Sequence, residues 1–157
     1  MTVSSSENLL EIRNLNVTFM SDGNVVKAVK NLNLNIPHGK TMGLVGESGS
    51  GKSVTSLAIM RLLPDHKGIN VTGEILYKGQ NLLNMSLKEM RAIRGNKISM
   101  IFQEPMTSLN PVYTVGDQID ETILLHQNLS KTQARKRTIE LLTEVGIPDP
   151  ASKVNAY

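Results

Sequence analysis

The chain has 157 residues and a formal net charge of +3, and 20% of its residues are charged. This length suffices for one domain with a hydrophobic core, and so weak a positive charge gives no reason to expect a nucleic-acid partner. The lack of cysteine excludes disulfides and thiolate metal sites, residues 1–8 are polar, and no apolar run approaches the length of a membrane span.

The first part of the chain is predicted to form an antiparallel β sheet. Apolar and polar residues alternate over residues 9–19, with an interruption at 13–14, and they alternate again over 25–36. Residues 21–24 lie between these segments and carry an Asp-Gly turn signal. The alternation predicts a sheet with one buried and one solvent-facing side, ended by a turn at residues 37–39.

Residues 46–53, Gly-Glu-Ser-Gly-Ser-Gly-Lys-Ser, fit the phosphate-binding pattern G-x-x-x-x-G-K-[ST]. We expect a short buried strand at 41–45 and a helix at 53–63 that Pro64 ends, which is the strand–loop–helix context that the pattern requires. In such a loop, glycines let successive backbone N–H groups point inward at an anion. The start of the following helix adds its positive dipole end.

The last two residues of the pattern have specific chemical roles in this interpretation. The ammonium group of Lys52 reaches the β- and γ-phosphates of a nucleotide, and the hydroxyl of Ser53 binds Mg²⁺. The predicted nucleotide-binding residues of this segment are Gly46, Glu47, Ser48, Gly49, Ser50, Gly51, Lys52, Ser53 and Val54.

Three further elements are predicted before residue 103: a strand at 71–77, a short helix at 86–94 with a capping box, and a compact apolar strand at 98–102. Two helices are predicted after it, capped by Thr114 and by Ser130. The apolar stripe of the second helix consists of Ala134, Thr138, Leu141 or Leu142, and Val145.

The phosphate loop together with residues 98–111, Ile-Ser-Met-Ile-Phe-Gln-Glu-Pro-Met-Thr-Ser-Leu-Asn-Pro, resembles the ATP-binding subunits of ABC transporters, and in particular those of oligopeptide and dipeptide importers. The resemblance covers residues 9–157. It implies an α/β P-loop NTPase fold of the ABC ATPase type, with an N-terminal antiparallel β subdomain and the beginning of a helical subdomain. We expect residues 1–157 to be a single incomplete domain, divided into an antiparallel part (9–39), a nucleotide-binding core part (40–103) and a glutamine-loop exit with the first helices (104–157).

The same resemblance implies roles for individual residues outside the loop. Phe19 matches the aromatic residue that stacks on adenine. Gln103 matches the glutamine that contacts Mg²⁺ and the attacking water, which makes it a catalytic candidate together with Lys52. The residues implied to contact the membrane permease are Glu104, Pro105, Met106 and Leu109.

Several parts of the family pattern have no match in this chain. The glycine pair of the signature loop is missing from residues 129–133, and neither an apolar strand ending in Asp-Glu nor the switch histidine is found. We therefore expect an N-terminal piece of a longer protein, which binds ATP and Mg²⁺ but by itself hydrolyses ATP negligibly.

The resemblance implies that the longer protein powers import of peptides, or of a related small solute such as nickel, through a permease. It would work with a second ATP-binding subunit, in the cytoplasm, on the inner face of the cell membrane, without nucleic acid and without a membrane span of its own.

Three alternatives remain at this point. A P-loop GTPase would use Asp65 to Gly68 as D-x-x-G, but Pro64 stands where a buried strand should lead in, and residues 96–99 lack the aspartate that reads guanine. A soluble ABC protein without a permease is the second alternative, and residues 102–111 argue against it. The third is a remnant that folds poorly because its sheet edges are unpaired.

Overall fold

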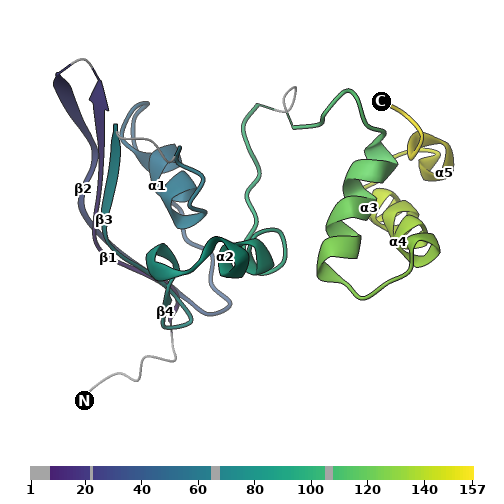
Figure 1. Cartoon of the computed structure of the whole chain (residues 1–157), viewed down its shortest axis with the longest axis horizontal. Helices are drawn as coiled ribbons and strands as arrows, with labels where there is room; N and C mark the ends of the chain where they lie inside the picture. Colours follow the sequence, from purple (N-terminus) through teal and green to yellow (C-terminus); the bar gives the residue numbers. More distant parts are fainter. Residues whose placement is uncertain (1–7, 22, 65–67, 105–107) are drawn as a thin grey trace. The chain divides into compact units, whose positions relative to one another are not determined.

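The computed structural model describes residues 8–21, 23–64, 68–104 and 108–157. The chain divides into two compact units, one ending at Arg94 and the other beginning at Gly95. Each unit is considered by itself, and Figure 1 labels the α-helices and strands of both.

The first unit is built on a sheet with a helix on one of its faces. Its elements are β1 (Asn8–Ser21), β2 (Asn24–Pro37), α1 (Lys52–Ile59), β3 (Ile69–Tyr77), β4 (Gln80–Asn81), the 3₁₀ turn η1 (Leu82–Asn84) and α2 (Leu87–Ile93). The strands are antiparallel in the order β2-β1-β3-β4. Figure 1 shows α1 on one face of this sheet. The predicted antiparallel sheet is therefore confirmed.

Alternating apolar side chains of the strands form the core beneath α1. The buried strand residues are Leu10, Ile12, Leu15, Val17, Val29 and Ile75. On the helix side, Thr55 and Ala58 are buried. The predicted interruption at residues 13–14 is also confirmed, because Asn14 has a φ of 49° and the register with β2 shifts between Ile12 and Leu15.

Among its described residues, the second unit has the helices α3 (Val115–His126), α4 (Lys131–Glu144) and α5 (Pro150–Lys153). The predicted caps are confirmed: the Thr114 hydroxyl accepts from the N–H of Asp117, and Ser130 with Gln133 forms a capping box. The buried residues of α4 are Ala134, Thr138 and Leu142. Val145 is 72% exposed, so its place in the predicted stripe is wrong.

Two predicted strands are not formed. Residues 41–45 and 98–102 lie within the described part of the chain, and neither segment joins a sheet, apart from an isolated bridge at Ile98. Val45 is 94% exposed and Ile101 97% exposed. An apolar segment becomes a strand only when a neighbouring strand accepts and donates its backbone hydrogen bonds, and no strand in the described residues does so here.

Helix α1 ends earlier than expected, at Ile59 instead of residue 63. Arg61 has a φ of 49°, its N–H donates to the Ala58 carbonyl at 3.0 Å, and the Leu62 N–H donates to the Leu57 carbonyl at 2.9 Å. These two bonds form a Schellman motif, which closes a helix without any proline. Arg94 then donates to the carbonyls of Met60 and Arg61, at 2.8 and 2.6 Å.

Candidate functional site

The phosphate loop lies directly against strand β2. Gly51, the last glycine of the loop, has a φ of 91°, and a Cβ added to it would collide with the carbonyl oxygen of Ala28. The same added atom would lie 3.4 Å from the side chain of Val29. Glycine is required here for two reasons, since its φ is left-handed and the backbone of β2 is too close for a side chain.

Lys52 folds back into its own loop. Its Nζ donates to the carbonyls of Gly46 and Glu47, both at 2.7 Å, and to the hydroxyl of Ser50 at 3.1 Å. The loop therefore surrounds the positive charge of this ammonium group. Such a charge, held beside backbone N–H groups, attracts a polyanion.

The start of helix α1 is open to a ligand. The N-cap residue Gly51 has no side chain, and no side chain in the described part of the chain caps this end of α1. Ser53 is exposed, which leaves its hydroxyl accessible from solvent. Unsatisfied N–H groups, the helix dipole and an accessible hydroxyl together can bind a phosphate with its metal ion.

Phe19 lies on the same face of the sheet as this loop. It follows Val17 by two positions on β1, and Val17 pairs with Val29, whose side chain is next to Gly51. Phe19 itself pairs with Val26 and Ile69 and is half-buried. The register shifts at Ala28, which is therefore a β-bulge beside the loop, and bulges often adjust the backbone next to functional sites.

The remaining predicted site residues belong to the second unit or lie outside the described residues. Gln103 and Glu104 are exposed, and Leu109 is 49% exposed. The Ser108 hydroxyl donates to the Glu104 carbonyl at 3.1 Å. Pro105 and Met106, two of the four expected permease contacts, are not among the described residues. The structure thus describes Phe19 and the loop in one unit, and Gln103 in the other.

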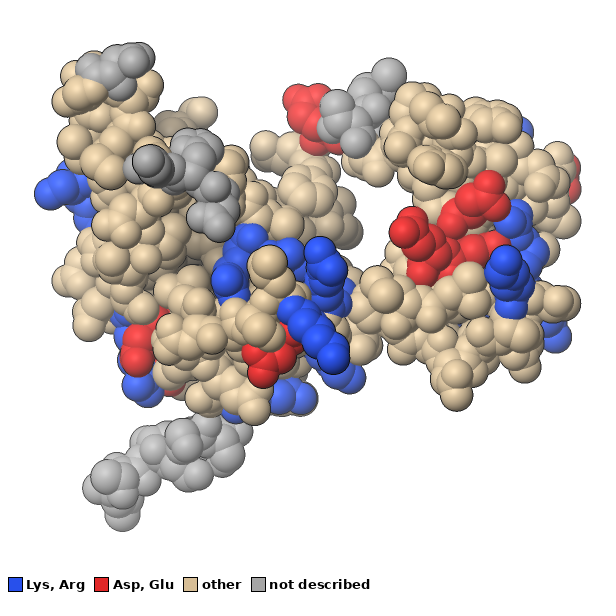
Figure 2. Space-filling view, viewed as in Figure 1, with Lys and Arg blue, Asp and Glu red and all other residues tan. Residues whose placement is uncertain are grey.

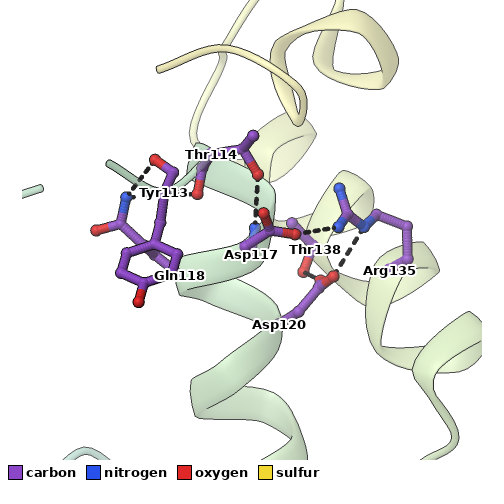
Figure 3. Close-up of polar contacts among 7 residues, drawn as sticks. All are labelled: Tyr113, Thr114, Asp117, Gln118, Asp120, Arg135 and Thr138. Carbon is purple, nitrogen blue, oxygen red and sulfur yellow. Dashed lines mark hydrogen bonds and ion pairs between the residues drawn. The ribbon is translucent and has the colours of Figure 1, made fainter. Parts of the chain in front are cut away.

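Sequence reasoning missed a polar cluster that connects α3 with α4. The Arg135 guanidinium pairs with Asp117 at 2.9 Å and with Asp120 at 2.7 Å, and the buried Thr138 hydroxyl donates to Asp120 (Figure 3). The Thr114 hydroxyl, and after it the Arg135 guanidinium, hold the pKa of Asp117 below its usual range. Figure 2 shows acidic and basic residues side by side on one face of the second unit. Spacing along α3 and α4 could not have predicted pairs between the two helices.

It also missed a repeated triplet. Asn-Leu-Asn occurs at residues 14–16, 31–33 and 33–35, and the copies at 14–16 and 31–33 lie side by side on β1 and β2. The repeat itself was the available signal.

In the described residues no group of three or more His, Asp or Glu side chains could hold a metal ion, and no helix among them is long and apolar enough to cross a bilayer.

Comparisons with known proteins give consistent matches. A family model described as "ABC transporter" matches residues 29–157. The oligopeptide transport ATP-binding protein OppD of Bacillus subtilis (strain 168) is 50% identical over 149 residues, which is 95% of this chain and 42% of that protein. The dipeptide transport ATP-binding protein DppD of the same strain is 49% identical over 151 residues, 96% of this chain and 45% of that protein. The chain thus spans less than half the length of these two relatives.

A solved structure is also similar. It is a dimeric ATP-binding cassette in a post-hydrolysis state, bound to ADP and Pi. The TM-score is 0.77 at 26% sequence identity, and the match covers 94% of this chain and 60% of that one.

Proposed function

The chain belongs to the ABC transporter family, and we propose that it binds Mg-ATP through residues 46–54. The predicted α/β P-loop fold of the ABC ATPase type is confirmed by the family match and by the likeness to the solved cassette. The observation that carries the proposal is the position of Lys52, whose ammonium lies inside a loop that also presents the open N-terminus of α1.

Phosphate binding changes the partners of Lys52. The ammonium leaves the carbonyls of Gly46 and Glu47 and pairs with β- and γ-phosphate oxygens, which are better acceptors because they are charged. The backbone N–H groups at the start of α1 bind the same phosphates. The hydroxyl of Ser53 would hold Mg²⁺, which neutralises charge on the phosphates.

The adenine base is assigned to Phe19. This side chain is half-buried, and it lies on the sheet face that contacts the loop through Val29. An aromatic ring binds a base by stacking, so it favours ATP over a bare triphosphate but separates ATP from GTP only weakly.

A transport role is proposed from the relatives. OppD and DppD are named as oligopeptide and dipeptide transport ATP-binding proteins. We assign to this chain the same role, in peptide import through a membrane permease and with a second ATP-binding subunit. Residues 103–111 would contact the permease, with Glu104 and the half-exposed Leu109 among the contacts and Gln103 on Mg²⁺ and the attacking water.

Hydrolysis by this chain alone should be negligible. Phosphoryl transfer requires water, Mg²⁺ and compensating charge to be positioned together. Lys52, Ser53 and Gln103 offer part of this machinery, whereas a carboxylate after an apolar strand and a signature loop have no match in the sequence. Steady turnover that Lys52→Ala abolishes would reveal a catalytic carboxylate that this assignment lacks.

The binding proposal is tested by calorimetry with Mg-ATP. Lys52→Ala should weaken binding by roughly 1.5–3 kcal/mol, because a charge-assisted hydrogen bond to phosphate is lost. Lys40→Ala is the matched control, since Lys40 is an exposed lysine outside the loop and should leave the affinity unchanged. Equal affinities of the wild type and Lys52→Ala would refute the phosphate site.

The permease contact is tested by crosslinking in the assembled transporter. A cysteine in place of Leu109 should link to the permease, because this side chain is half-exposed in the proposed contact segment. Gln80→Cys, at an exposed position of β4 in the other unit, should not link. Equal linking at both positions, or none at residue 109, would remove this segment from the permease interface.

A further inference from the structure

Three strands of the sheet depart from extended geometry along one line. Asn31 on β2 has a φ of 46°, Asn14 on β1 has a φ of 49°, and Gly73 on β3 has a φ of 104°. Left-handed residues are unusual within strands, and asparagine and glycine are the residues that tolerate them best. The register of β1 shifts here against both neighbours.

Two asparagine side chains, those of Asn16 and Asn33, bind the backbone of two other asparagines, Asn14 and Asn31, along this line. We name these four residues the asparagine clasp. The N–H of Asn14 donates to Oδ1 of Asn33, and the N–H of Asn31 donates to Oδ1 of Asn16, both at 2.9 Å. The bonds are reciprocal around the paired Leu15 and Leu32.

Asn16 and Asn33 also bind the backbone of their own strands. Nδ2 of Asn16 donates to the Asn14 carbonyl at 2.8 Å, and Nδ2 of Asn33 donates to the Asn31 carbonyl at 3.1 Å. The side-chain amides thus replace the ladder bonds that the two left-handed residues cannot make.

Strand β3 can approach β1 closely at this line because its residue there, Gly73, has no side chain. A Cβ added to Gly73 would lie 2.5 Å from the carbonyl oxygen of Asn14 and 2.7 Å from that of Arg13. The irregularity therefore crosses all three long strands. Bulges and glycine kinks in register across a sheet bend it.

The bend separates two parts of the sheet with different tasks. On one side, β2 runs on to Pro37 and the chain leaves toward the phosphate loop. On the other side lie Phe19, the bulge at Ala28, and Val29, which contacts the loop at Gly51. The clasp therefore lies between these two parts, on the strands that carry Phe19 and contact the loop at Gly51.

We propose that the asparagine clasp positions Phe19 for the nucleotide base, so that its residues determine base affinity without contacting the ligand. This inference rests on the proposed binding of ATP and deepens it. The triphosphate contacts the loop and α1, whereas the base contacts the hairpin beyond the bend. A change at the clasp therefore alters the contacts of the base and leaves the contacts of the triphosphate unchanged.

The experiment compares Mg-ATP with Mg-tripolyphosphate, which has the phosphates but no base. The wild type should bind ATP about tenfold or more tightly than tripolyphosphate, the amount expected from one stacked base. Asn33→Ala, which removes two bonds of the clasp, should reduce that ratio severalfold and leave tripolyphosphate binding within twofold of the wild type.

Three further variants sharpen the result. Phe19→Ala should reduce the same ratio, and adding Asn33→Ala to it should cause little further loss, because both act on one contact. Asn35→Ala, an exposed asparagine of β2 outside the clasp, should leave the ratio unchanged. If circular dichroism finds Asn33→Ala unfolded, Asn33→Asp takes its place, because it keeps the acceptor for the Asn14 N–H.

The outcomes separate the two proposals. An unchanged ratio in the clasp variant, or equal loss of both ligands in a folded variant, would overturn the positioning role while the ATP site stands. A wild type that binds tripolyphosphate and ATP equally would overturn the base site and the clasp proposal together. A wild type that binds neither ligand would overturn the proposed function itself.

Discussion

The side-chain amide of Gln118 makes two hydrogen bonds to the backbone of Asn110. Nε2 donates to the Asn110 carbonyl at 3.0 Å, and Oε1 accepts from the Asn110 N–H at 2.8 Å. The same Nε2 donates to the carbonyl of Tyr113 at 3.0 Å (Figure 3). The end of the proposed permease-contact segment, residues 103–111, is thereby attached to helix α3, which carries Gln118.

Gln118→Ala should loosen this attachment. It removes the partners of the Asn110 N–H and carbonyl, and each such bond contributes about 1 kcal/mol. Amide hydrogen exchange at Asn110 should therefore accelerate about fivefold or more. Gln118→Glu keeps an acceptor and should preserve most of the protection, while the N–H of Gln133 in α4 serves as an unaffected reference. Unchanged exchange at Asn110 in Gln118→Ala would contradict the attachment.

Gly116→Ala should destabilise the second unit by roughly 1–3 kcal/mol, as expected for overpacking. The Gly116 N–H donates to the Val154 carbonyl at 2.9 Å, and an added Cβ would lie 2.6 Å from that oxygen and collide with the Arg135 guanidinium. Chemical denaturation measures the loss. Glu121→Ala on the exposed surface of α3 is the control and should change stability by less than about 0.5 kcal/mol. Similar stabilities of the two variants would show that α5 moves freely.

Gly73→Ala should cost more stability than Gly79→Ala. Both glycines have a positive φ, 104° and 81°, so both variants acquire backbone strain. Only at Gly73 does the new Cβ also meet backbone, 2.5 Å from the Asn14 carbonyl oxygen, whereas nothing lies within 4 Å at Gly79. We expect a difference of about 1–3 kcal/mol in urea unfolding. Equal losses of stability would mean that the backbone of β1 at Asn14 moves away from the new Cβ at little cost.

The capping box of α2 should make the stability of the first unit sensitive to acid. The hydroxyl and then the backbone N–H of Ser86 donate to Glu89 and hold the pKa of this carboxyl below its ordinary value of 4.5. A lowered folded-state pKa means that the contribution is complete above about pH 4.5 and declines as the pH falls through the folded-state value.

Glu89→Gln keeps an oxygen acceptor but cannot titrate. Urea unfolding at pH 7, 5, 4 and 3 should therefore show a smaller loss of stability on acidification for the variant than for the wild type. Parallel curves for the two proteins would indicate that the Glu89 carboxylate contributes nothing to the pH dependence.

Short-range patterns in the sequence predicted much of both units. The helix starts at Ser86, Thr114 and Ser130 were predicted because a cap and its partner are three residues apart on the chain. The alternation over residues 9–36 predicted the hairpin, and the break at 13–14 was visible within it. The phosphate loop is likewise a contiguous motif, and the family resemblance that it supports was confirmed.

What the sequence determined by itself was therefore the set of local structures, because their physical causes lie within a few residues. The tertiary structure alone decided which segments find partners. Residues 41–45 and 98–102 have the composition of strands but form none, since no strand in the described residues pairs with them. The clasp joins Asn14 to Asn33, the loop requires Gly51 because of Ala28, and Arg135 reaches Asp117 and Asp120 on another helix. Each of these contacts connects residues that only the folded backbone brings together, so their energies depend on geometry that no local pattern contains.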